Sequence, residues 1–349
     1  MVSREKRVTL QDVADDAGVS RATASLVVRG SKSIKPSTHK KVLDSMEKLG
    51  YVYDRVAASF RLQRSSTIGV IVTDIENPFY PHILTHIEHV LYEQRFNVLL
   101  GMSFESTEKQ ERVLETMLEH RVCGIIMTPV ASTSPALFTK LQNLNIPTLL
   151  IGREVDTVNT DYVGTDYRLG AEMAVRHLIE QGHRRIAYLG GSPQGNTSYK
   201  ERFAGYCQAL QQFGLEIDPA LIITSPINRD GGTRAVQEAM QLSNPPTACF
   251  CNNDVIALGA MIGLQLQGRT PGKHMAIVGF DNVQETETAK PGLSSVSVFQ
   301  DKWGSEAAKL LLKRINGDQS EPTRIIIPPQ LIIRESSTSY SGFHSSSPL

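Results

Sequence analysis

The sequence predicts a small all-α head followed by a large α/β body made of two doubly wound parallel sheets. The first 64 residues show helical patterns and no run of alternating apolar residues. From Thr67 onward, short apolar runs alternate with amphipathic segments, which is typical of parallel strands joined by helical crossovers. The chain has 349 residues, and the body alone is long enough for two such sheets rather than one.

Two helices are predicted at the start of the head. The first begins after Thr9, which can form a capping box with Asp12, and it ends at Gly18 because glycine enters the left-handed conformation freely. Ser20 is expected to cap the second helix, from Arg21 to about Val28. The apolar face of the first helix would consist of Leu10, Val13, Ala14 and Ala17.

A third helix is expected to start near Pro36 and to stop at Gly50, with an apolar face formed by Val42, Met46 and Leu49. The turn from Ala17 to Ser20 gives the head the layout of a helix-turn-helix, in which the second helix exposes its N-terminal side chains to a DNA major groove. The small Ala14 and Ala24 would let the two helices cross closely, and Val19 would fill the core. A helical hairpin without a DNA partner would show the same caps, so this alternative stays open on these residues alone.

The zero net charge of the chain hides a division between head and body. Residues 1–64 hold 13 Lys and Arg against 7 Asp and Glu, so the head carries +6 and the remaining 285 residues carry −6. A basic head favours a polyanionic partner for that part of the chain.

The body is expected to contain seven buried parallel strands, each apolar on both faces. They are the segments IGVIV, FNVLLG, VCGIIM, PTLLIG, RIAYLGG, TACFC and MAIVGFD. Amphipathic segments such as Pro81–Gln94 and Gly170–Gln181 would supply the crossover helices. The C-terminal ESSTSYSGFHSSSPL is rich in serine and is expected to be disordered.

Ligands of open α/β sheets bind beyond the carboxyl ends of the strands. Polar and aromatic residues follow the predicted strands of both halves and should converge on one cleft, a mixture of groups suited to a sugar. They are Asn77, Phe79, Tyr80, Arg153, Arg202, Asn253 and Asp281. Three structural alternatives stay open: Arg202 with Asp281 as an ion pair, Asn253 as a helix cap, and Phe79 as core.

Other patterns argue against a metal, a cofactor or a membrane span. The four cysteines, Cys123, Cys207, Cys249 and Cys251, are expected to be reduced, buried thiols, and no zinc-like CxxC is present. Cys249 and Cys251 would lie on one face of a strand. His82, His86 and His89 would lie on one face of a helix, a spacing that can bind zinc, but no further zinc ligand is evident. The segment GGSPQG at residues 190–195 matches neither GxGxxG nor the P-loop, the two glycine-rich motifs that bind phosphates. No apolar run reaches the length of about 18 residues that a membrane span needs, and the N-terminus does not resemble a signal peptide, so a cytoplasmic protein is expected.

The segment VTLQDVADDAGVSRATASLVV resembles the DNA-binding head of the lactose-repressor (LacI/GalR) family. The similarity continues through KKVLDSMEKLGYVYDRVAASFR, IGVIVTDIENPFY, NNDVIALGA and VGFDN, and it covers residues 8–335. The SLVV-x-G ending is similar to the maltose-regulon repressor branch. The resemblance implies a helix-turn-helix head on a body like the type I periplasmic binding proteins.

The resemblance also implies roles for individual residues. Arg21, Ala22 and Leu26 would contact bases, with Arg21 reaching a guanine edge and the other two making apolar contacts. Residues better placed for phosphates, or on the hinge, are Thr9, Ser20, Thr23, Ser25, Arg29 and Arg55. Phe60 takes the place of the leucine that the family wedges between base steps. Arg202, Asn253 and Asp281 would contact the effector, with Phe79 and Tyr80 lining the first half of the cleft.

The main hypothesis is therefore a ligand-controlled repressor that binds a palindromic, double-stranded operator as a homodimer, since the tail lacks heptads for a tetramer. A solute-binding receptor shares the body fold but requires a signal peptide, and an enzyme would need a catalytic set that is not evident. The expected domains are residues 1–52 (head), 53–66 (hinge), 67–341 (effector binding and dimerisation) and 342–349 (disordered tail). The N-subdomain would take about 67–165 and 298–327, and the C-subdomain about 166–297 and 328–341.

Overall fold

The computed structural model divides the chain into two compact units, Met1–Ser65 and Ser66–Leu349. It describes residues 8–28, 31, 33–51, 65–192 and 195–338. The described helices of the first unit, the head, are α1 (Leu10–Asp16), α2 (Arg21–Val28) and α3 (Pro36–Leu49). These three helices match the ranges that the sequence predicts.

The caps of the head helices are confirmed. The Thr9 backbone N–H donates to Asp12 Oδ2 at 2.7 Å, and the Asp12 N–H donates to Thr9 Oγ1 at 3.3 Å, which completes the capping box. Ser20 Oγ accepts from the Thr23 N–H at 3.1 Å and so caps α2. Gly18 has a φ of +64°, as the turn requires.

The core of the head holds the three helices together. Its fully buried members are Val13, Ala14, Ala24, Val27 and Val42, and Val19 packs against them from the turn. The buried Ser45 hydroxyl of α3 donates to the Val13 carbonyl at 3.2 Å. The crossing of α1 and α2 is therefore fixed by small and apolar side chains, which leaves the opposite side of α2 outside the core.

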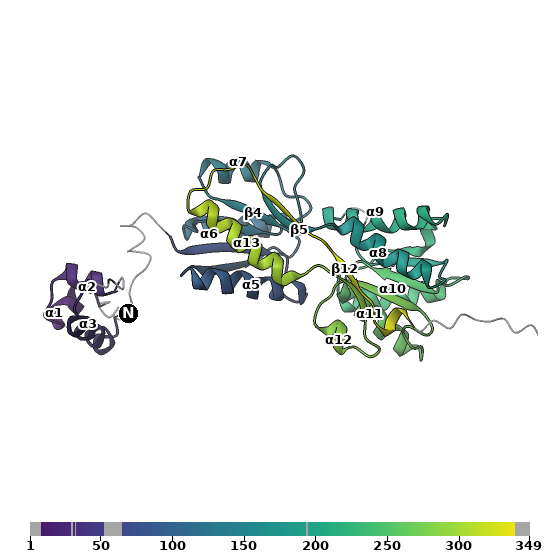
Figure 1. Ribbon diagram of the computed structural model, residues 1–349, viewed down its shortest axis with the longest axis horizontal. Coiled ribbons are helices and arrows are strands. Elements are labelled where there is room, and N and C mark those ends of the chain that lie inside the picture. The colour runs from purple at the N-terminus through teal and green to yellow at the C-terminus, as the bar shows by residue number, and fades with distance from the viewer. Residues whose placement is uncertain (1–7, 29–30, 32, 52–64, 193–194, 339–349) are drawn as a thin grey trace, which may run out of the picture. The chain divides into compact units, whose positions relative to one another are not determined.

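The body contains two six-stranded sheets (Figure 1). The first has the order β11-β5-β4-β3-β1-β2, with β1 (Thr67–Val72), β2 (Asn97–Met102), β3 (Ile125–Met127), β4 (Thr148–Ile151), β5 (Asp161–Thr165) and β11 (Arg324–Ile327). The second has the order β12-β10-β9-β8-β6-β7, with β6 (Ile186–Leu189), β7 (Ile222–Ile223), β8 (Ala248–Cys251), β9 (Ala276–Asp281), β10 (Ser294–Ser297) and β12 (Gln330–Ile332). The chain thus passes between the sheets after β5, after β10 and after β11.

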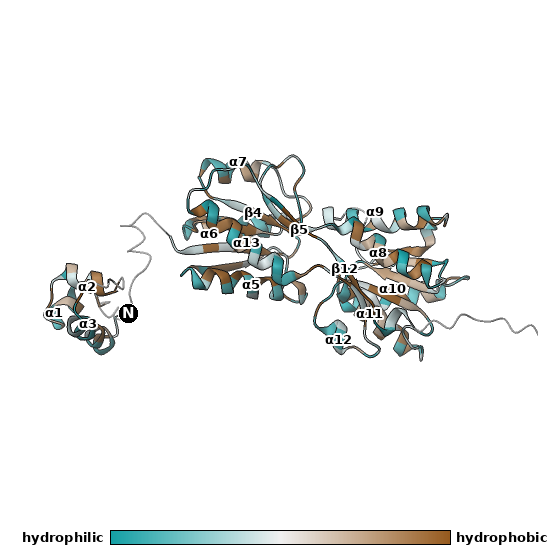
Figure 2. Ribbon diagram, in the orientation of Figure 1, coloured by the Kyte–Doolittle hydropathy of each residue, from teal (hydrophilic) through white to brown (hydrophobic). Residues whose placement is uncertain are grey.

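Helices cover both faces of each sheet. One lobe carries α5 (Phe79–Glu93), α6 (Thr107–Glu119), α7 (Ala136–Asn143) and α13 (Gln300–Ile315). The other carries α8 (Tyr167–Glu180), α9 (Thr197–Gln212), α10 (Arg229–Gln241), α11 (Asp254–Leu266) and α12 (Glu285–Thr288). Short 3₁₀ turns lie at Pro219–Leu221 and Glu335–Ser337. In Figure 2 the helices alternate between teal and brown along their length, as expected for helices that bury one face against a sheet.

Three sequence-based expectations about the body were wrong. The strand β2 is partly exposed along its length because it forms the edge of its sheet, so it is not apolar and buried on both faces. β12 runs antiparallel to β10, so the second sheet is not wholly parallel. Glu335–Ser337 is ordered rather than disordered, because Ser336 Oγ donates to the Ile277 carbonyl at 2.6 Å and accepts from the Ser294 N–H at 2.8 Å. The tail 342–349 lies outside the described residues.

The cysteines also differ in part from expectation. All four are free, but Cys123 and Cys207 are only half-buried, whereas Cys249 and Cys251 are buried in β8. Within the described ranges, no cluster of His, Cys, Asp or Glu has the arrangement of a metal site. In the same part of the chain, no helix is both long and apolar enough to cross a membrane.

Candidate functional site

The second helix of the head presents its N-terminal side chains to solvent. Arg21 and Ala22 are exposed in the first turn of α2, and the Leu26 side chain one turn later is 39% exposed. Ala24 and Val27 of the same helix are buried. The helical period therefore separates a packed face from a face that bears the three residues predicted to contact bases.

Several hydroxyls predicted to bind phosphates already take part in caps. Thr9 Oγ1 donates to Asp12 Oδ2 at 2.7 Å, and the Ser20 and Thr23 hydroxyls lie 2.9 Å apart. Ser25 is half-buried on α2. Arg29, Arg55 and Phe60 lie outside the described residues, so their predicted roles at the hinge and on the DNA stay predictions.

A cavity of about 660 Å³ lies in the body, beyond the carboxyl ends of strands from both sheets. This volume is ordinary for a small-molecule site. All seven residues that the strand-end rule selected line it: Asn77, Phe79, Tyr80, Arg153, Arg202, Asn253 and Asp281. The sequence therefore correctly predicted that these residues lie around one cavity. Their contacts with a ligand stay a prediction.

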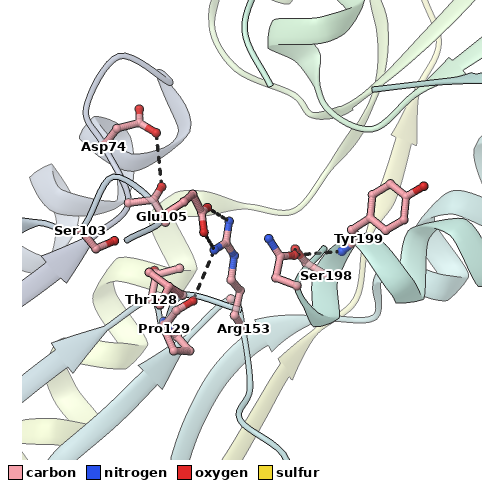
Figure 3. Close-up of polar contacts among 12 residues, drawn as sticks. Asp74, Ser103, Glu105, Thr128, Pro129, Arg153, Ser198 and Tyr199 are labelled. Carbon is pink, nitrogen blue, oxygen red and sulfur yellow. Dashed lines mark hydrogen bonds and ion pairs between the residues drawn. The ribbon is translucent and has the colours of Figure 1, made fainter. Parts of the chain in front are cut away.

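Arg153 and Glu105 form the charged wall of the cavity on the first lobe (Figure 3). Arg153 follows β4, and its guanidinium makes two hydrogen bonds to Glu105, Nη2 to Oε1 at 2.7 Å and Nη1 to Oε2 at 3.0 Å. Its Nη1 also donates to the Pro129 carbonyl at 3.3 Å. This bidentate geometry holds the buried guanidinium in one orientation.

Arg202 and Asp281 form the corresponding pair on the second lobe. Arg202 Nη2 donates to Asp281 Oδ1 at 3.2 Å, and both side chains are more than nine-tenths buried. The guanidinium also lies over the rings of Tyr167 and Phe280, 4.7 and 4.3 Å from their centroids. The ion-pair alternative for these residues is thus confirmed as a contact, within the wall of the cavity.

The other two alternatives are also observed as contacts. Asn253 Oδ1 accepts from the Ile256 N–H at 3.2 Å and caps α11. Phe79 is buried in the core, where its ring meets that of Trp303 edge-on at 5.5 Å. Both residues line the cavity as well, so each combines a structural contact with a position at the cavity wall.

Sequence reasoning missed the residue that holds Asp281 in place. Asp281 and Asn282 have φ angles of +112° and +55°, a conformation that non-glycine residues adopt at a cost. The fully buried Asp254 accepts from the Val283 N–H at 2.9 Å and from Ser295 Oγ at 2.6 Å. Ser295 Oγ in turn accepts from the Asn282 N–H at 3.0 Å. This network fixes the backbone that carries Asp281.

Further lining residues that were not selected from the sequence include Asp74, Glu105, Tyr167, Tyr199 and Trp303. Asp74 and Glu105 follow β1 and β2, so the strand-end rule could have found them. The three aromatic residues lie on helices α8, α9 and α13. No local signal separates them from ordinary core residues.

Two family models match the chain. One, described as "Bacterial regulatory proteins, lacI family", matches residues 9–54, and one described as "Periplasmic binding proteins and sugar binding domain of LacI family" matches residues 65–335. The chain belongs to the LacI family. The predicted fold class of helix-turn-helix head and periplasmic-binding-protein-like body is therefore confirmed, and the chain is a DNA-binding transcriptional regulator.

Individual LacI-family members match over nearly their whole length. Catabolite control protein A of Priestia megaterium is 33% identical over 329 residues, 94% of this chain and 99% of that protein. A transcriptional regulator CelR–cellobiose complex has a TM-score of 0.71 at 31% identity, covering 95% of this chain and 100% of that one. The lac repressor dimer bound to operator and the anti-inducer ONPF has a TM-score of 0.83 at 25% identity, covering 96% and 100%. The similarity to the maltose-regulon branch stays a prediction.

Effector binding to this LacI-family chain is expected to weaken as the pH falls from 8 to 6. Burial raises the pKa of Asp281 to about 7, although the neighbouring Arg202 opposes the shift. The carboxylate that can accept hydrogen bonds from a ligand hydroxyl is therefore present above that pH and lost below it. Burial also raises the pKa of the neighbouring Asp254. Calorimetric titration at pH 6, 7 and 8 tests this, and equal affinities across the range contradict it.

Proposed function

We propose that the chain is a repressor that binds a palindromic operator as a homodimer and whose operator affinity is set by a small molecule, a sugar or sugar derivative, in the body cavity. The observation that carries this proposal is a cavity lined by both lobes, in a chain whose head exposes Arg21, Ala22 and Leu26 on the second helix of a helix-turn-helix. The names of the matching proteins support it, since they include a repressor bound to operator and a regulator bound to cellobiose.

The proposed mechanism is a population shift. A ligand that contacts both lobes favours one arrangement of the lobes over the other, and the difference in its affinity for the two arrangements is the free energy available for control. In a dimer, that change would alter the separation of the hinge segments, proposed at residues 53–66, and so the docking of the two heads on DNA.

The proposal includes finer points. Arg21, Ala22 and Leu26 would contact bases, the seven predicted cavity residues would contact the effector, and the domain boundaries would follow the expected ranges. The chain would act in the cytoplasm as a regulator and not as an enzyme. Its matching proteins are named as transcriptional regulators, which supports this over a solute-binding receptor.

Selection from a random DNA library with the full-length chain tests the DNA half of the proposal. We expect a palindromic site, bound by two chains. Gel-shift titration of that site with and without each sugar that raises the melting temperature then tests the ligand half. A sugar that binds the chain and leaves operator affinity unchanged contradicts the proposed control.

A further inference from the structure

The chain crosses between the two lobes of the body at three places, and the three crossovers differ in stiffness. The first, after β5, and the third, after β11, are tied together, because Thr165 Oγ1 donates to the Ile327 carbonyl at 2.6 Å. The third also contains prolines at positions 328 and 329, whose rings fix the backbone φ angle. The second crossover, between β10 and α13, consists of Val298 and Phe299 and contains no proline. Its backbone therefore keeps the most freedom to turn.

Phe299 has a backbone conformation that a residue with a side chain rarely adopts. Its φ and ψ angles are +57° and +63°, in the left-handed region. This region crowds the Cβ atom against the backbone, and the conformation persists only where the surrounding structure imposes it. The strain is therefore located at the joint between the two lobes.

Gln300, the next residue, connects the two lobes directly. It begins α13, which packs so closely on α5 of the first lobe that a Cβ at Gly304 would lie 2.5 Å from the Ile83 carbonyl oxygen. The Gln300 side chain is buried, and its Nε2 donates to the carbonyl of Asp281, the last residue of β9 in the second lobe. This hydrogen bond fixes α13 against β9 and so holds Phe299, which lies between them in the chain, in its strained conformation.

The two features act in opposite directions on the same equilibrium. The hydrogen bond of Gln300 stabilises the arrangement of the lobes in this structure, whereas the strain at Phe299 destabilises it. A rotation of α13 away from β9 would break the bond and would let Phe299 return to an ordinary backbone conformation. Opposed contributions keep two arrangements close in free energy, so that a ligand with a modest difference in affinity can shift their populations.

We propose that Phe299 is the pivot residue of the body, and that its strain and the Gln300–Asp281 hydrogen bond together set the balance between two lobe arrangements before any effector binds. This inference rests on the proposed function in taking operator affinity as the measure of lobe arrangement. It goes further in naming two residues that set the operator affinity of the unliganded chain.

Gln300→Met tests the hydrogen bond, because methionine has a similar size and no donor. We expect the affinity of the unliganded full-length chain for the selected palindromic operator to change at least about threefold in gel-shift titration. Gln110→Met is the matched control: Gln110 is buried, and it donates to Thr133 Oγ1 at 3.0 Å and accepts from the Val130 N–H at 2.9 Å, all within the first lobe. This control should lower the melting temperature and leave operator affinity unchanged. An unchanged affinity in Gln300→Met overturns the proposal.

Phe299→Gly and Phe299→Ala separate the backbone from the ring, because both remove the ring and only glycine enters the left-handed region freely. The melting temperature of Phe299→Gly should exceed that of Phe299→Ala by about 2–4 °C, the shift expected when one strained residue is relieved in a domain of this size. Added to Gln300→Met, Phe299→Gly should move operator affinity back toward the wild-type value, and Phe299→Ala should not. Equal melting temperatures of the two single variants, or equal affinities of the two double variants, overturn the assignment of the pivot.

Arg95 provides the control for relief of strain elsewhere in the body. It is exposed, follows α5 in the first lobe and has a φ of +64°. Arg95→Gly should also melt higher than Arg95→Ala, with the same operator affinity. If the Arg95 pair differs in affinity as the Phe299 pair does, strain relief in general explains the effect and the pivot is wrong. All of these measurements are made without effector, so the pivot can fail while ligand control stands. Ligand control fails separately, when no sugar changes the operator affinity of the wild-type chain.

Discussion

Asp281→Ala is expected to lower the free energy of unfolding of the body by about 3–5 kcal/mol and to abolish the response to effector. Asp281 is the carboxylate partner of the buried Arg202, and a guanidinium cannot lose its charge when its partner is removed. Arg202→Ala should cost less at pH 7, because Asp281, whose pKa is raised to about 7 by burial, can become neutral by taking up a proton. Both variants should lose the response, since each removes a proposed contact with the ligand.

Urea denaturation followed by circular dichroism measures the stabilities, and gel-shift titration with and without the bound saccharide measures the response. Lys309→Ala is the control, because the Lys309–Glu306 ion pair is exposed and should be worth no more than about 1 kcal/mol. If the body of the Asp281→Ala variant unfolds with an unchanged free energy, the buried Arg202–Asp281 ion pair does not have the predicted effect on stability. A normal response in the more stable Arg202→Ala means that the effector site lies elsewhere.

Arg21→Ala is expected to weaken operator binding by about 1–3 kcal/mol, the worth of a bidentate contact to a base, and to leave binding to random DNA nearly unchanged. Arg21 is exposed in the first turn of α2, and its neighbours on that face, Ala22 and Leu26, can make only apolar contacts. Of the three predicted base-contacting residues, Arg21 alone has a polar side chain. Fluorescence anisotropy with labelled operator and labelled random duplex measures both affinities.

Lys41→Ala removes the same charge from α3 of the head, where Lys41 is exposed. It should weaken binding to the operator and to random DNA by similar amounts, because the general attraction of a lysine charge to the phosphates carries no sequence information. If Arg21→Ala also weakens both DNAs equally, Arg21 contacts phosphate, and the specificity of the head must come from other groups.

The head could be predicted almost completely from sequence because its signals are local. A capping box at Thr9, a glycine at position 18 and a cap at Ser20 each act within four residues, and the structure confirms all three. Two of the strands that the sequence did not predict lack such signals. β5 (DYVGT) and β10 (SSVS) have few apolar residues, and hydrogen bonds to distant strands define them.

The cavity could be predicted in outline for a different reason. Arg153 follows β4 and Asp281 ends β9, so the strand-end rule was sufficient for these two residues. Arg202 also lines the cavity, but it does so from inside α9 rather than from a loop at a strand end. Trp303 could not be found in this way, because it enters the wall from α13, more than one hundred residues beyond most of the strands around it. The support of Asp281 by Asp254 and Ser295 depends equally on tertiary packing.

The position of Trp303 has a consequence for optical experiments on this protein. It is the only tryptophan of the chain, it is fully buried, and its ring meets Phe79 of α5 and Tyr167 of α8 edge-on, one helix from each lobe. Tryptophan fluorescence therefore originates entirely in the cavity wall and should respond to a rearrangement of the lobes. Unfolding of the head should leave this fluorescence unchanged. Far-ultraviolet dichroism records both units, so the difference between the two melting curves isolates the DNA-binding head without any added dye.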